Sequence, residues 1–255
     1  MKEIHYFDHI HLGSEHLQRW RKRYAEMLAE GGRWPVTVER DRLERLLNSG
    51  VDDEWYRELL HNRDGWALDI TPLYARVGVE GFSHMKSIVR RVKLIYILRD
   101  PVERAWSGMH QKYGKNRGMD MEMFESRLDD IESLERECTT DPDIAAKSDY
   151  ADTLSSIREA GMEDDLLVLY HDDISADPDS FIDTIYRFIG IENGIAGSRE
   201  YRDIIGRKIY ESQKKLEMPP LLEERLVSHY AGSLSLLEEK YGLELPESWR
   251  KRYGI

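Results

Sequence analysis

An arginine and a serine eight residues apart are the side chains of this 255-residue sequence best placed to do chemistry. Arg99 follows the apolar run 94–98, whose β-branched and aromatic side chains are typical of a strand buried on both faces in a parallel sheet. Asp100 and Pro101 then predict a helix start, because aspartate caps open amides and proline loses no hydrogen bond in a first turn. Ser107 falls about two turns into that helix. At this edge of an open α/β sheet, a guanidinium and a hydroxyl can hold one anionic group.

A second pair of candidates lies near the start of the sequence. Residues 3–8 alternate well enough to predict a short strand or extended segment, with Glu3 and His5 on the same side. Two titratable side chains on one face are candidates for proton transfer. The alternative interpretation is a frayed terminus whose charges are solvated.

The composition, with 40% hydrophobic and 34% charged residues, is ordinary for a soluble globular protein. No apolar stretch approaches the length of a membrane span, and the N-terminus lacks the apolar segment of a signal peptide. Cys138 is the only cysteine, so no internal disulfide can form and a reducing cytoplasm is the simplest compartment. The net charge of −12 argues against broad nucleic-acid or membrane-surface binding, so an anionic ligand needs local basic groups.

The run 98–107, Leu-Arg-Asp-Pro-Val-Glu-Arg-Ala-Trp-Ser, resembles a segment of the sulfotransferases that use 3′-phosphoadenosine 5′-phosphosulfate (PAPS). In that family the arginine and the serine eight residues later hold the 3′-phosphate of the donor. The resemblance therefore implies that Arg99 and Ser107 bind PAPS. An isolated pair of this kind would be interpreted as a strand-end arginine and an ordinary helix-surface serine, but the ten-residue match favours the family.

Residues 2–8 resemble the Lys-Glu-x-His-Phe-Phe-Asp element of heparan-sulfate-type and related bacterial sulfotransferases. There the glutamate is the proposed general base that takes a proton from the acceptor hydroxyl. The resemblance implies that Glu3 is the base and that His5 assists or stabilises charge, with Asp8 a weaker acceptor-side candidate. Residues 69–74 resemble the Glu-Lys-Thr-Pro-x-Tyr segment, but Ile70 replaces the lysine, which leaves the acceptor class open.

The stretch 205–215 is rich in basic residues although the protein as a whole is acidic, and this local charge requires an explanation. In the family a late Ser-Lys-Gly-Arg-type loop folds over the adenosine and phosphates of the donor. Lys214 and Lys215 match this loop by position, and Arg207 with Lys208 is the competing pair.

The family's glycine-rich loop of the type Lys-x-Gly-Thr-Thr-Ser, which holds the 5′-phosphosulfate, has no counterpart in the sequence. We expect either that a first strand and its loop are missing through truncation or a misplaced start, or that the chain is a divergent member.

The predicted elements indicate an α/β fold, a parallel sheet flanked by helices, with strands at 66–70, 94–98 and 166–170. An acidic helical segment is expected over 121–137 and an amphipathic helix from Pro178 to Gly190. The resemblance implies the P-loop nucleotide-kinase-like sulfotransferase fold. A single domain over 1–255 would then have three parts: a helical acceptor-side region (9–65), a sheet and nucleotide-binding core (66–190), and a basic loop with a helical tail (191–255).

The resemblance implies transfer of a sulfonate group from PAPS to a hydroxyl or amine of a carbohydrate, lipid or small-molecule acceptor. Catalysis would rest on in-line positioning and charge neutralisation, and nothing in the sequence requires a metal. The alternatives are an inactive relic that binds only nucleotide or a protein partner, and a nucleotide kinase of related topology that lacks its Walker lysine.

Overall fold

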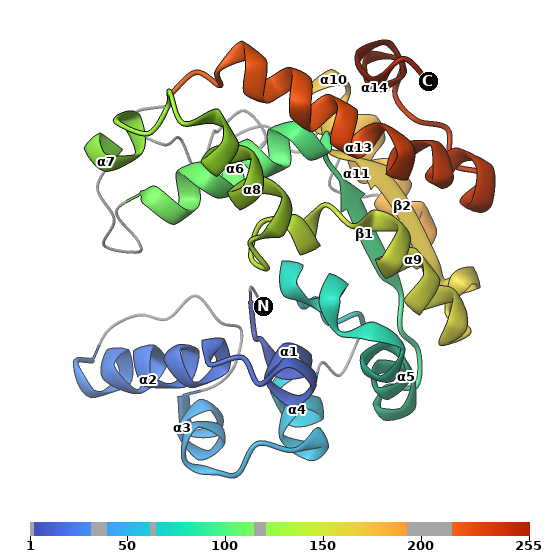
Figure 1. Cartoon of the computed structure of the whole chain (residues 1–255). Coiled ribbons are helices and arrows are strands. Elements are labelled where there is room, and N and C mark those ends of the chain that lie inside the picture. The colour runs from blue at the N-terminus through green and yellow to red at the C-terminus, as the bar shows by residue number, and fades with distance from the viewer. Residues whose placement is uncertain (1–2, 32–39, 62–64, 115–120, 193–215) are drawn as a thin grey trace. The chain divides into compact units, whose positions relative to one another are not determined.

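The computed structural model describes residues 3–31, 40–61, 65–114, 121–192 and 216–255 (Figure 1). Its contacts divide the chain into two compact units. Unit 1 consists of Met1–Val92 with Ser155–Asp164, and unit 2 consists of Lys93–Leu154 with Asp165–Ile255. The single domain expected over 1–255 stays a prediction.

Unit 1 is helical, as the sequence predicts for much of residues 9–65. Asp52 caps one of these helices by accepting a hydrogen bond from the Trp55 amide at 2.8 Å. The apolar faces of the helices enclose a small core that includes Ile4, Leu17 and Leu43. The helices are α1 (Tyr6–Leu12), α2 (His16–Ala29), α3 (Arg40–Asn48), α4 (Asp53–Leu60), the 3-10 helix η1 (Pro72–Arg76) and α5 (Gly78–Ile88).

The strand expected at residues 3–8 is wrong. Glu3 and His5 have left-handed φ angles of 57° and 64°, and α1 begins directly after them. Long-range bonds favour this geometry over local alternation: the Glu3 amide donates to the Ile70 carbonyl at 2.9 Å, and the Tyr6 amide donates to the Tyr74 hydroxyl at 3.0 Å. The strand expected at 66–70 is likewise reduced to a single bridge residue, Ile70.

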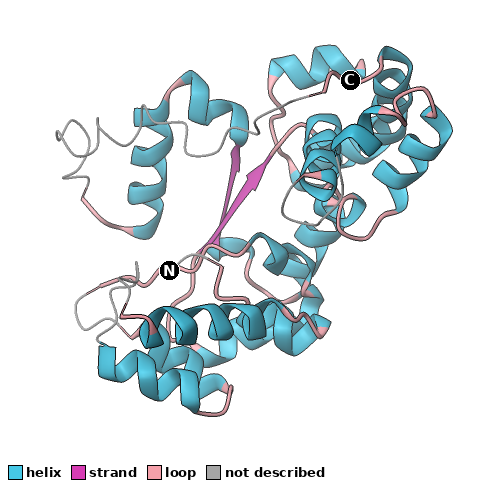
Figure 2. Cartoon of the chain, turned by 90° about the vertical axis from the view of Figure 1, so that its left-hand side faces the viewer, coloured by secondary structure: helices cyan, strands magenta, loops and turns pink. Residues whose placement is uncertain are grey.

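Unit 2 contains the two other predicted strands, β1 (Leu94–Leu98) and β2 (Leu166–Tyr170), which pair in parallel from Leu94↔Leu166 to Leu98↔Tyr170. Figure 2 shows them in magenta among the helices. Within the described ranges the sheet consists of these two strands. Leu98 is fully buried and the rest of β1 is half-buried, so the strand is less enclosed than its apolar run suggests.

The helix predicted after β1 is α6 (Pro101–Tyr113), and Asp100 caps it by accepting from the Glu103 amide at 3.1 Å. The acidic segment 121–137 is not one helix, because Asp130 caps a new helix through the Ser133 amide. The remaining helices assigned wholly or partly to unit 2 are α7 (Met121–Glu125), α8 (Ile131–Thr140), η3 (Ala145–Lys147), α9 (Tyr150–Glu159), η4 (Glu163–Asp165), α10 (His171–Ala176), α11 (Pro178–Ile189), α13 (Pro220–Tyr241) and α14 (Glu247–Tyr253). The boundary between the units divides α9 and η4.

The core of unit 2 forms where α13 packs against α6, α8 and α14. Burying each large apolar side chain there stabilises the fold by about 1.5–3 kcal/mol. Helix α13 thus contacts both α6 and α14, which are far apart in the sequence. The members of the core that are no more than 1% exposed include Met109, Leu134, Leu226, Leu237 and Trp249.

Candidate donor-binding and acceptor-side sites

Arg99 directly follows β1 and Ser107 lies on α6, as the sequence predicts. The Arg99 side chain is 30% exposed, and its Nη2 lies 3.4 Å from a carboxylate oxygen of Glu103. The Arg99 Nε is buried and has no hydrogen-bond partner within the described part of the chain. Ser107 is exposed. The Arg99 guanidinium, which has an unused donor, and the exposed Ser107 hydroxyl on the next helix together suit an anionic ligand.

Tyr150 of α9 holds the backbone of Arg99. Its hydroxyl donates to the Arg99 carbonyl at 2.5 Å and accepts from the Arg99 amide at 3.3 Å. Burial raises the pKa of Tyr150 to about 12, so this hydroxyl stays protonated at neutral pH. Tyr150 is not among the candidates from the sequence, because nothing local links it to a residue 51 positions earlier.

Basic side chains lie at the carboxyl ends of the two strands. His171 follows β2 as Arg99 follows β1, and the strand register places them at the same edge. Desolvation lowers the pKa of His171, and the charges of Arg99 and Arg104 lower it further against the opposing effect of nearby carboxylates. The Nε of Arg104 is also buried without a partner among the described residues. His171 is not among the site candidates from the sequence, although its position is at the edge that carries Arg99.

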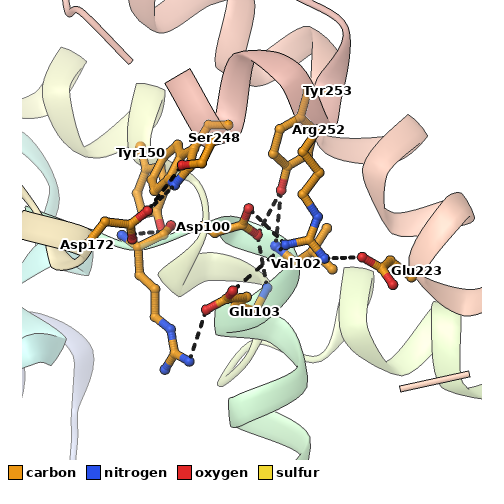
Figure 3. A network of polar contacts seen from close by, with 11 residues as sticks. Asp100, Val102, Glu103, Tyr150, Asp172, Glu223, Ser248, Arg252 and Tyr253 are labelled. Carbon is orange, nitrogen blue, oxygen red and sulfur yellow. Dashed lines mark hydrogen bonds and ion pairs between the residues drawn. The ribbon is translucent and has the colours of Figure 1, made fainter. Parts of the chain in front are cut away.

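Asp100, the residue after Arg99, is 4% exposed and is surrounded by donors (Figure 3). Besides capping α6, its carboxylate accepts from the Tyr253 hydroxyl at 2.9 Å and from Arg252 Nη1 at 3.1 Å. Arg252 also forms an ion pair with Glu223. The turn that carries Arg99 is therefore bonded to α14. The two contributing residues of α14 are not among the candidates from the sequence.

In unit 1, Glu3 is exposed, whereas His5 is only 8% exposed. The His5 Nδ1 lies 3.1 and 3.2 Å from the two carboxylate oxygens of Asp8, and the ring stacks on His16 at 4.6 Å between centroids. Burial by itself raises the pKa of Asp8, but the hydrogen bonds from His5 and Ser14, the charge of His5 and a backbone hydrogen bond together hold that pKa below its usual value. The ionised carboxylate of Asp8 thus fixes the orientation of the His5 ring.

Asp69 is a hydrogen-bond centre of unit 1. Its carboxylate accepts from the Tyr74 hydroxyl at 2.6 Å, the Thr71 hydroxyl at 2.7 Å and the Tyr56 hydroxyl at 3.1 Å. The Ile4 amide is 3.4 Å away. Burial raises the pKa of Asp69 even though these donors oppose the rise. Asp69 anchors the backbone between Glu3 and His5, which is a structural contact.

Glu3 and His5 belong to unit 1, and Arg99 and Ser107 belong to unit 2. The basic residues Lys214 and Lys215, and the competing pair Arg207 and Lys208, lie outside the described residues.

The family model of the sulfotransferase domain matches residues 83–229, which is more than half of the chain and includes the Arg99–Ser107 segment. The chain therefore belongs to the sulfotransferase domain family. It is also similar to the crystal structure of a sulfotransferase from Alicyclobacillus acidocaldarius, with a TM-score of 0.55 and 20% identity over 78% of this chain and 74% of that chain. This likeness supports the α/β sulfotransferase fold. No curated protein matches the chain.

Two further observations concern the described ranges alone. No helix in them is both long enough and apolar enough to cross a bilayer. No group of three or more His, Cys, Asp or Glu side chains in them is arranged to hold a metal ion.

Proposed function

We propose that this sulfotransferase transfers the sulfonate group of PAPS to a hydroxyl or amine of a carbohydrate, lipid or small-molecule acceptor. Membership of the family supports sulfonate transfer in general. The choice of donor rests on Arg99, which lies at the carboxyl end of β1. Its Nε is buried and has no partner among the described residues, and Ser107 lies on the helix that follows.

In this proposal the guanidinium of Arg99 forms a forked ion pair with the 3′-phosphate, and the Ser107 hydroxyl donates a hydrogen bond to it. The phosphate competes with Glu103, whose carboxylate is 52% exposed and lies 3.4 Å from the guanidinium. An exposed pair of this kind contributes little, about 0–1 kcal/mol, so exchanging it for a phosphate is favourable. Lys214 and Lys215 bind the nucleotide from the basic stretch.

On the acceptor side, Glu3 takes the proton from the attacking hydroxyl or amine as the new bond to sulfur forms. Its exposed carboxylate can reach such a group. His5, oriented by the Asp8 carboxylate, assists by stabilising charge near the acceptor.

Calorimetry with adenosine 3′,5′-bisphosphate tests the donor site. Arg99→Ala is expected to weaken binding about tenfold to a hundredfold, which is the loss of roughly 1.5–3 kcal/mol from a charge-assisted pair. Arg225→Ala is the matched control, because Arg225 is also in unit 2, is 38% exposed and pairs with a carboxylate, that of Glu135. Equal affinities for the wild-type chain and Arg99→Ala would remove Arg99 as the phosphate ligand. Binding without any turnover of PAPS would favour the relic that only binds nucleotide.

A further inference from the structure

Helix α14 is bonded to the turns that follow both strands of unit 2. After β1, Asp100 accepts from Arg252 and Tyr253. After β2, Asp172 accepts from the Trp249 indole nitrogen at 3.1 Å and lies 3.4 Å from the Ser248 hydroxyl. The turns after both strands, which carry Asp100 and Asp172, are thus held from one helix (Figure 3).

The Tyr253 hydroxyl has two roles at the start of α6. It donates to Asp100 at 2.9 Å and accepts from the Val102 amide at 3.4 Å. The Glu103 amide donates to the same Asp100 oxygen. Amides in the first turn of a helix have no partner within the helix, so Tyr253 and Asp100 together satisfy two of them. Tyr253 is 7% exposed, and burial raises its pKa, so its hydroxyl stays protonated.

Arg252 adds an ionic link to the candidate site. Its Nη1 lies 3.1 Å from Asp100 and 3.9 Å from the Glu103 Oε1, while the other oxygen of Glu103 contacts Arg99. Glu103 is therefore shared between two guanidinium groups. Glu103 thus links the Arg99 guanidinium to α14 through Arg252.

We propose that Tyr253, together with Arg252, is a positioning residue for recognition of the donor's 3′-phosphate. The two side chains fix the Asp100 turn, and the turn sets the direction in which the Arg99 guanidinium meets the phosphate. This inference rests on the proposed function, because it assumes that Arg99 binds a 3′-phosphate. It predicts an effect on selectivity for that phosphate.

The test compares adenosine 3′,5′-bisphosphate with adenosine 5′-phosphate, which lacks the 3′-phosphate, by calorimetry on the full chain. Tyr253→Phe keeps the ring and removes the hydroxyl. The ratio of the two affinities is expected to fall about fivefold to tenfold through weaker binding of the bisphosphate, with binding of the monophosphate unchanged. Tyr113→Phe is the matched control: Tyr113 is 3% exposed at the other end of α6, and its hydroxyl also donates to a carboxylate, that of Glu137, at 2.9 Å. Its ratio is expected to equal that of the wild-type chain.

An unchanged ratio of affinities in Tyr253→Phe overturns the inference. This includes an equal loss of affinity for both nucleotides, because a merely structural role weakens both alike. If Tyr253→Phe does not fold, Arg252→Met is judged by the same ratio. A wild-type chain that does not prefer the bisphosphate contradicts the proposed function itself. A wild-type preference that survives both substitutions contradicts only the role of α14.

Discussion

The exposed Glu3 and the buried pair of His5 and Asp8 lie next to each other in sequence but have different surroundings. Glu3 is exposed to solvent, whereas His5 is held by a carboxylate and a stacked ring. Such a division suits one residue that moves a proton and another that is fixed in place.

Glu3→Gln is expected to lower turnover of PAPS with a hydroxyl acceptor by about 10²–10⁴-fold, which is typical for loss of a general base. The affinity for adenosine 3′,5′-bisphosphate should change little. Rates of sulfonate transfer and calorimetry check the two halves of this prediction, and Glu26→Gln, at another exposed glutamate of unit 1, is the control. Full turnover in Glu3→Gln would reject Glu3 as the base.

The lowered pKa of Asp8 makes a prediction about stability and pH. A carboxyl whose pKa is depressed below its unfolded value of 3.8 stabilises the fold above that value, and the stabilisation is lost as pH falls through the folded pKa. Asp8→Asn should therefore cost about 1.5–3 kcal/mol at about pH 5, and this cost should shrink as pH falls below about 4. Urea unfolding at both pH values measures it, with Asp41→Asn on α3 as an exposed control. A cost that does not depend on pH would contradict the role of the charge.

At the scale of elements, two helices of unit 2 begin with the same Asp-Pro pair. Asp100 and Asp177 each cap a helix by accepting from the amide three residues later. Asp177 is exposed, whereas Asp100 is buried and also bonded to α14. The two caps look alike in the sequence and differ in what surrounds them.

Asp100→Ala is expected to destabilise the protein by about 2–4 kcal/mol, because a cap and charged hydrogen bonds are lost together. Asp177→Ala loses only the cap, which contributes about 1 kcal/mol. Denaturant unfolding of the two variants gives the comparison. Equal costs would mean that the contacts from α14 contribute nothing to stability.

At the scale of the whole molecule, an acidic chain with a net charge of −12 binds an anionic nucleotide only where local cations outweigh the global field. Arg99 and Arg104 supply positive charge near the carboxyl edge of the sheet, both within unit 2. In the proposal, these two guanidinium groups supply the positive charge that an anionic nucleotide needs at this edge.

Binding at this edge should stabilise the folded chain. Adenosine 3′,5′-bisphosphate at 100 times its dissociation constant is expected to add about 2.7 kcal/mol, which corresponds to a rise in melting temperature of roughly 5–10 °C for a chain of this size. Thermal melting with and without the nucleotide measures the rise. At the same nucleotide concentration Arg99→Ala should show a much smaller rise, and an equal rise would place the nucleotide elsewhere.

The sequence by itself predicts what depends on neighbouring residues. The apolar runs of β1 and β2, the helix after Asp100 and Pro101, and the positions of Arg99 and Ser107 follow from local propensity and from a cap that reaches three residues ahead. The sulfotransferase family follows from the same ten-residue segment, and the match over 83–229 confirms it.

Only the tertiary structure decides what depends on residues far apart in the chain. The extended start at residues 3–8 is wrong because Ile70 and Tyr74, more than 60 positions later, bond its amides and favour a turn into α1. The bonds from Tyr150 and Tyr253 to the Arg99 turn span 51 and 153 positions. No local pattern encodes bonds over such separations. The bond from Tyr253 forms only when the packing of α13 brings α6 and α14 together.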